Sequence, residues 1–163
     1  MPNNICYDNN QILIKGKRAS WGIITILFFL MIISGLIPIA ATILVLIYGD
    51  GLHFGLVISY LLFWGGGYYL LRLVLWNTYG QEIFTLENDK IRYIADYKLF
   101  KNGRQEIDIQ NLKIEIITHE ETNKPVGRLK LTNGNTSIVS VLSAGLNDLK
   151  EIAEKLKTHY NIA

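Results

Sequence analysis

The chain contains only one cysteine, Cys6, among its 163 residues. A single cysteine cannot form an internal disulfide or supply a cysteine-based metal site, and it fits a reducing compartment. Histidine is nearly as rare, with three residues. His53, His119 and His159 each lack a carboxylate or a second histidine at ligand spacing. This pattern argues against a zinc site, so we expect neither a metal nor a cofactor.

Charged residues are also scarce, at 18% of the chain, and two long intervals have none. One interval lies between Arg18 and Asp50, and the other between Asp50 and Arg72. Each is long enough for a helix to cross a hydrocarbon core of roughly 30 Å, which takes about 20 residues. A single run could be a buried helix, but two in tandem predict a transmembrane hairpin over residues 21–76. The first run is too long for the apolar core of a cleaved signal peptide, about 7–15 residues.

The charges that flank these runs predict an orientation. The basic residues lie at the outer ends of the hairpin: Lys15, Lys17, Arg18 and Arg72. Because positive side chains collect on the cytoplasmic side, we expect an inner-membrane protein with two spans and both termini in the cytoplasm. Arg72 then marks the inner end of the second span, and a functional charge inside the membrane is the alternative. The aromatic rings expected near a membrane interface are Trp64, Tyr68, Tyr69 and Trp76.

Small residues recur along the second run. They lie on one predicted helix face: Gly51, Gly55, Ser59 and Gly67. Lipid provides no hydrophobic force between helices, so close contact depends on small residues that let two backbones approach. We therefore expect this face to pack on the first helix or on a partner. A ligand crevice at the triple glycine of residues 65–67 is the alternative.

From Gln81 onward, apolar residues alternate as they do in strands, and Asn102-Gly103 and Asn133-Gly134 are typical of two-residue hairpin turns. An apolar stripe over residues 146–160 predicts a final amphipathic helix. The sequence thus indicates an α+β membrane protein with a segment 1–20, a helical hairpin 21–76 and a cytoplasmic domain 77–163 of about six antiparallel strands. The patch Ile12-Leu13-Ile14 is either an edge strand of that sheet or an interfacial segment.

Motifs of catalysis and of nucleic-acid binding are missing from this sequence. No glycine-rich phosphate loop follows a strand, and no serine sits in a nucleophile elbow. The pair Glu120-Glu121 fits a solvated loop better than acid–base catalysis. Twelve basic and twelve acidic residues cancel from Asn77 to the C-terminus, whereas nucleic-acid binding favours a basic face. We expect no enzyme and no nucleic-acid partner.

The junction between the second run and the first strand resembles that of small bacterial membrane proteins with a pleckstrin-homology-like (PH-like) domain. Their pattern Trp-Asn-x-x-Gly-x-Glu is matched here by Trp76, Asn77, Gly80 and Glu82. The layout of two spans followed by such a domain is also similar to the photosystem I assembly factor. The resemblance implies an antiparallel PH-like sheet or barrel that is capped by the C-terminal helix. The first hairpin loop, Glu87 to Lys90, is acidic on balance and departs from phosphoinositide-binding members.

These observations favour a non-enzymatic, membrane-anchored interaction or scaffold protein. The hairpin would hold the domain at the cytoplasmic face of the bilayer, where the domain would bind a membrane or secreted protein or a second copy of itself. Two alternatives remain open at this point. One is an immunity protein that protects the membrane against a membrane-acting toxin, and the other is a lipid-sensing regulator.

Overall fold

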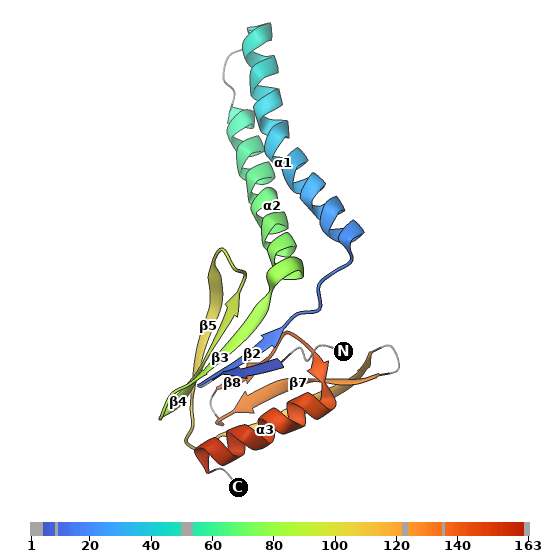
Figure 1. Cartoon of the computed structure of the whole chain (residues 1–163). Helices are drawn as coiled ribbons and strands as arrows, with labels where there is room; N and C mark the ends of the chain where they lie inside the picture. The colour runs from blue at the N-terminus through green and yellow to red at the C-terminus, as the bar shows by residue number, and fades with distance from the viewer. Residues whose placement is uncertain (1–4, 9, 50–53, 122–123, 135, 162–163) are drawn as a thin grey trace. The chain divides into compact units, whose positions relative to one another are not determined.

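A computed structural model describes residues 5–8, 10–49, 54–121, 124–134 and 136–161 (Figure 1). The chain divides into two compact units. One comprises Met1–Lys17 together with Tyr79–Ala163, and the other is Arg18–Thr78. The expected α+β class is confirmed: two apolar helices are followed by antiparallel strands and a C-terminal helix.

The Arg18–Thr78 unit is a helical hairpin. Helix α1 spans Trp21–Tyr48 and helix α2 begins at Phe54 and ends at Tyr79. Both are long and apolar enough to cross a membrane, and only 6% and 0% of their most apolar windows are buried. A helix that is apolar on all sides and exposed differs from a soluble core helix, whose apolar face is covered. Gly49 caps the C-terminus of α1 at a φ of 78°, a left-handed conformation that glycine adopts without a steric cost.

Helix α2 continues past the expected end of the span. Asn77 and Thr78 remain helical, and their side chains donate hydrogen bonds to the carbonyl oxygens of Leu73 and Val74 at 2.8 and 2.7 Å. These bonds to the preceding turn satisfy both polar side chains without interrupting the helix. The boundary placed at residue 76 from the sequence thus falls inside the last turn of α2.

The other unit begins with a five-stranded antiparallel sheet. Its strands are β1 (Ile5–Asp8), β2 (Gln11–Lys15), β3 (Gln81–Leu86), β4 (Lys90–Asp96) and β5 (Lys101–Asp108), in the order β1-β2-β3-β4-β5. Strand β2 therefore lies inside the sheet and not at its edge. Ile12 and Ile14 are fully buried, as expected for an interior strand. Residues 11–15 pair with residues 81–85, so the helical hairpin is an insertion between two neighbouring strands.

A second antiparallel sheet follows. It contains β6 (Lys113–Glu121), β7 (Lys124–Thr132), β8 (Ser137–Val139) and the short β9 (Ala144–Gly145). The described residues thus form nine strands in two sheets, where the sequence suggested about six. No ladder joins the two sheets in the described ranges, so the barrel is not closed. Between β5 and β6 the Leu112 N–H donates to the Ile109 carbonyl oxygen, and Asn111 has a φ of 56°, so the chain turns away from β5.

Helix α3 (Leu146–Tyr160) covers the second sheet (Figure 1). Leu149, Ile152 and Leu156 recur at helical spacing on its buried face. A Cβ at Gly127 in β7 would come within 2.8 Å of the Ile116 side chain and 3.2 Å of Leu149. Any side chain at this position would therefore have to displace Ile116 in β6 and Leu149 in α3.

Candidate functional site

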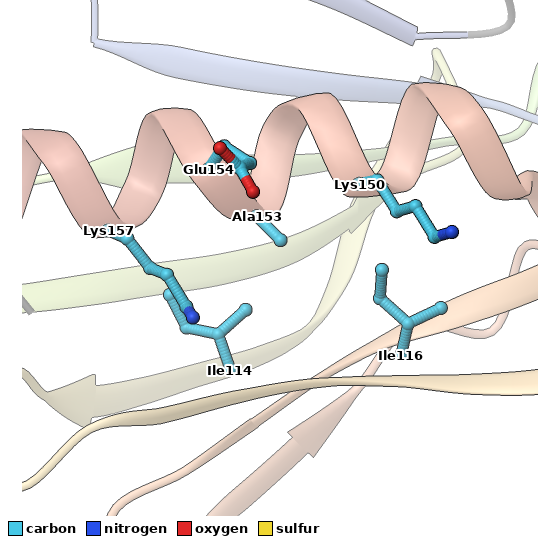
Figure 2. A pocket seen from close by; sticks show the side chains of 6 residues that line it. All are labelled: Ile114, Ile116, Lys150, Ala153, Glu154 and Lys157. Carbon is cyan, nitrogen blue, oxygen red and sulfur yellow. The ribbon is translucent and has the colours of Figure 1, made fainter. Parts of the chain in front are cut away.

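A groove lies between one flank of α3 and strand β6 (Figure 2). It encloses about 250 Å³. Its lining residues come from these two elements alone: Ile114, Ile116, Lys150, Ala153, Glu154 and Lys157. Side chains alternate along a strand, so Ile114 and Ile116 share the face toward α3 while Lys113 and Glu115 point the other way. The four helix residues follow the i, i+3, i+4, i+7 spacing of one helix flank.

The hydrogen bonds of β7 determine which backbone groups of β6 point outward. The Ser140 N–H donates to the Leu129 carbonyl oxygen at 2.8 Å, and the Asn133 N–H donates to the Thr136 carbonyl oxygen at 3.1 Å. Odd-numbered residues at and just after β7 therefore bond toward β8. Alternate residues of an antiparallel strand direct their N–H and C=O groups to opposite sides. Even-numbered residues of β7 thus bond to β6.

The strand register carries this alternation onto β6. Glu115 is opposite Lys130, and Ile117 is opposite Arg128, so Glu115 and Ile117 bond to β7. Ile114 and Ile116 consequently direct their N–H and C=O groups away from β7. Among the described residues β6 pairs with β7 alone. The two isoleucines that line the groove therefore also carry the polar groups of an open sheet edge.

Two lysines stand over this edge. Figure 2 shows the side chains of Lys150 and Lys157 extending from α3 toward Ile116 and Ile114. They are seven positions apart in the sequence, which corresponds to about 10 Å along a helix. On α3 the ion pair that forms is Lys155 with Glu151, at 2.7 Å, whereas Lys150 and Lys157 make no ion pair with a described residue. Glu154 lies between them, so the groove carries a net positive charge.

Glu82 was expected at the domain junction, and the structure gives it a further part. Its side chain is fully buried, and its carboxylate accepts hydrogen bonds from the Tyr93 hydroxyl at 2.7 Å and from the N–H groups of Val141 and Leu142 at 2.7 and 3.2 Å. Burial raises the pKa of Glu82, and these hydrogen bonds oppose the rise. Burial and the bond to Glu82 likewise raise the pKa of Tyr93. The carboxylate ties the first sheet to the segment after β8.

The predicted small-residue face of α2 divides into two parts. A Cβ at Gly67 would lie 3.4 Å from the Ser34 hydroxyl oxygen of α1, and that hydroxyl donates to the Phe63 carbonyl oxygen. A Cβ at Gly55 would meet nothing within 4 Å. Each step of four residues overshoots a full turn by about 40°, so Gly67 is rotated by about 120° from Gly55. Ser59 is half-buried, and Gly51 lies outside the described residues.

A polar contact also holds the hairpin nearer its turn. The hydroxyl oxygens of Thr42 in α1 and Tyr60 in α2 lie 3.1 Å apart, and the Tyr60 ring meets Trp64 edge-on, with centroids 5.0 Å apart. At the opposite end of the hairpin, the Ala19 N–H donates to the Asn77 carbonyl oxygen at 3.1 Å. The two helices are thus joined by polar contacts at several levels.

The proposed interface residues lie at different depths along α2. Trp64, Tyr68 and Tyr69 are exposed and occupy the middle of the helix, whereas Arg72 and Trp76 are half-buried in its last third. The basic residues before α1, Lys15, Lys17 and Arg18, are exposed. Of the junction residues, Asn77 lies in the last turn of α2. The Gly80 carbonyl oxygen accepts a hydrogen bond from the Gly16 N–H at 3.0 Å.

The groove was not predicted from the sequence. The alternation of apolar residues after Gln81 predicted strands, and the apolar stripe over residues 146–160 predicted the last helix. Neither pattern indicates that β6 is an edge strand or that a groove remains between β6 and one flank of α3. Searches against family models, curated proteins and solved structures gave no match for this chain.

Proposed function

We propose that this chain is a non-enzymatic, membrane-anchored protein-binding module that captures an extended, acidic segment of a partner protein along β6. The observation that carries the proposal is the open edge at Ile114 and Ile116, whose N–H and C=O groups face the groove side without a strand partner among the described residues. Such an edge is a template for an additional strand, so soluble proteins normally protect it.

The chemistry of the groove favours one kind of segment. Backbone groups of an added strand would pair with those of Ile114 and Ile116, which supplies affinity without regard to sequence. Alternate side chains of that strand would lie over the two isoleucines and beneath α3. Carboxylates at its ends would complement Lys150 and Lys157, and lysine side chains would be repelled.

The helical hairpin supports the anchoring part of the proposal. Lys15, Lys17 and Arg18 precede α1 and Arg72 lies in the last third of α2, so the positive-inside rule favours an orientation with both termini in the cytoplasm. Two sheets capped by a C-terminal helix fit a PH-like domain. The domain would then receive its partner at the cytoplasmic face of the inner membrane.

A selection experiment tests this proposal. The full-length chain in lipid nanodiscs is panned against a random peptide library, and the selected peptides are synthesised and measured by fluorescence polarisation. We expect extended sequences that alternate β-branched residues with Asp or Glu. Replacing their acidic residues with lysine should abolish binding. Selection of helical or basic peptides would contradict the proposal.

A matched pair of variants localises the binding. Lys157→Glu reverses a charge over the groove, whereas Lys113→Glu makes the same change on the opposite face of the same region. Lys157→Glu should weaken peptide binding roughly five- to tenfold, because each tenfold change in affinity corresponds to about 1.4 kcal/mol and one charge contact is lost. Lys113→Glu should leave it unchanged. Equal effects of the two substitutions would place the peptide elsewhere.

A further inference from the structure

The five-stranded sheet carries opposite charges at its two ends. The register aligns Lys15, Gln81, Asp96 and Lys101 in one row across β2 to β5, at the end where the chain leaves for the helices. The residues just beyond this row add Lys17 and Lys98. The opposite end carries acidic residues: Asp8, Glu87, Asp89 and Asp108. One end is therefore basic, with Asp96 as its acidic exception, and the other is acidic on balance, with Lys90, which is opposite Asp108 and pairs with Glu87, as its basic exception.

An apolar side chain projects from the basic end. Leu99, in the β4–β5 turn, is 72% exposed. The turn is well ordered by its own contacts: the Tyr97 N–H donates to the Phe100 carbonyl oxygen at 3.0 Å, and the two rings stack with centroids 4.7 Å apart. The Asp96 carboxylate accepts a hydrogen bond from the Lys98 N–H at 2.8 Å. Leu99 is thus held outward by a defined turn.

The same turn contacts the last residue of helix α2. The Lys98 ammonium lies 4.2 Å from the centroid of the Tyr79 ring. This cation–π contact places the β4–β5 turn within one side-chain length of the point where α2 ends. Lys15 and Gln81 are also the last sheet residues on either side of the inserted helices, so the basic end of the sheet is the end that the chain connects to the helical hairpin.

We infer that the basic end of the five-stranded sheet, with Leu99 at its tip, is a binding surface for anionic phospholipids of the membrane that anchors the chain. The inference rests on the membrane insertion of α1 and α2 and is independent of the groove. Lysines near an anionic bilayer are attracted to its headgroups, and a projecting leucine enters the interface beneath them. The acidic end of the sheet is repelled, so the attraction selects one face of the domain.

Site-specific fluorescence tests the inference. In a Cys6→Ser background, an environment-sensitive label is attached to Leu99→Cys, to Asn88→Cys at the acidic end or to Val57→Cys within α2. Each full-length protein is reconstituted in vesicles of phosphatidylcholine alone or with added phosphatidylglycerol. We expect the label at 99 to shift to the blue and to lose iodide quenching in the anionic vesicles. The shift should disappear in high salt, which screens charges over a few ångström.

The labels at positions 88 and 57 are controls for an aqueous and a lipid environment. The label at 88 should stay aqueous in both vesicle types, and the label at 57 should be buried in lipid in both. Lys98→Glu with Lys101→Glu should abolish the shift at 99, whereas Lys150→Glu with Lys157→Glu, the same charge change on α3, should preserve it. An aqueous label at 99 in anionic vesicles, with 57 still buried, would overturn the inference and leave the anchor intact. An aqueous label at 57 would overturn both.

Discussion

The backbone N–H of Gly16 donates a hydrogen bond to the carbonyl oxygen of Gly80 at 3.0 Å, although both apolar helices lie between these residues in the chain. This bond extends the β2–β3 ladder, in which Lys15 is opposite Gln81. The two units are therefore joined by two connections, at residues 17–18 and 78–79. The helical hairpin is thus inserted between two paired strands of the five-stranded sheet, and two chain segments connect it to the domain.

The insertion predicts that the domain folds without the helices. Replacing residues 17–79 with Asn-Gly would leave Gly16 opposite Gly80, a hydrogen-bonded pair, and close β2 and β3 with a two-residue turn of preferred sequence. We expect a soluble protein with a cooperative thermal transition and the circular dichroism of the intact domain. An aggregated or non-cooperative product would mean that the helices contribute to the fold of the sheet.

Glu82→Ala should destabilise the domain by about 2–4 kcal/mol. The substitution leaves the buried Tyr93 hydroxyl without its acceptor, which costs about 1–3 kcal/mol, and it also removes the part-buried hydrogen bonds from the N–H groups of Val141 and Leu142. Glu115→Ala is the matched control, since it removes an exposed carboxylate that pairs with Lys130 and should destabilise the domain far less than Glu82→Ala. Urea unfolding measures the loss of stability in each variant. Equal losses for Glu82→Ala and Glu115→Ala would contradict a structural role for Glu82.

Glu106 should make stability depend on pH in the acid range. Hydrogen bonds from Lys90, Arg104 and Arg92 lower its pKa to about 2. Because the folded pKa lies below the ordinary value of 4.5, its contribution is present above pH 4.5 and is lost as the pH falls toward 2. Glu82 acts in the opposite direction, because its pKa is raised.

The pH dependence of Glu106 is measured by thermal unfolding of the wild type and Glu106→Gln between pH 6 and pH 2, a range chosen to bracket these pKa values. The variant should lose less stability than the wild type as the pH falls. Parallel curves would show that the network of Glu106 does not influence folding.

Gly67 and Gly55 should respond differently to leucine. Gly67→Leu places a side chain against Ser34 of α1 and should destabilise the hairpin by about 1–3 kcal/mol through overpacking. Gly55→Leu enters open space and should leave the stability unchanged or raise it, because glycine disfavours the helix. Thermal unfolding in detergent compares the two. A larger loss at Gly55 would mean that the helices pack on the other part of the face.

Local patterns in the sequence were sufficient to predict the helices and the presence of strands. The charge-free intervals predicted α1 and α2, and the stripe containing Leu149, Ile152 and Leu156 predicted α3. These features depend only on residues close together in the chain. A period of two likewise identifies a strand, but it does not identify the neighbour with which the strand pairs.

The features that were not predicted depend on long-range pairing. Ile12 and Ile14 are core residues because β2 pairs with β3, although the two helices lie between these strands in the sequence. The groove exists because β6 stays at a sheet edge, which the run of residues 113–117 does not reveal. Gly55 and Gly67 share a four-residue spacing, but the helix twist rotates them apart, so only contact geometry separates them.

Amide hydrogen exchange along β6 tests the central claim most directly. In the free protein the Ile114 and Ile116 amides should exchange quickly, whereas those of Glu115 and Ile117, which bond to β7, should be protected. Addition of a selected acidic peptide to the full-length chain should slow exchange at Ile114 and Ile116 and change Glu115 and Ile117 little. Protection of Ile114 and Ile116 before any peptide is added, or no change when it binds, would contradict the account of β6 as the docking edge.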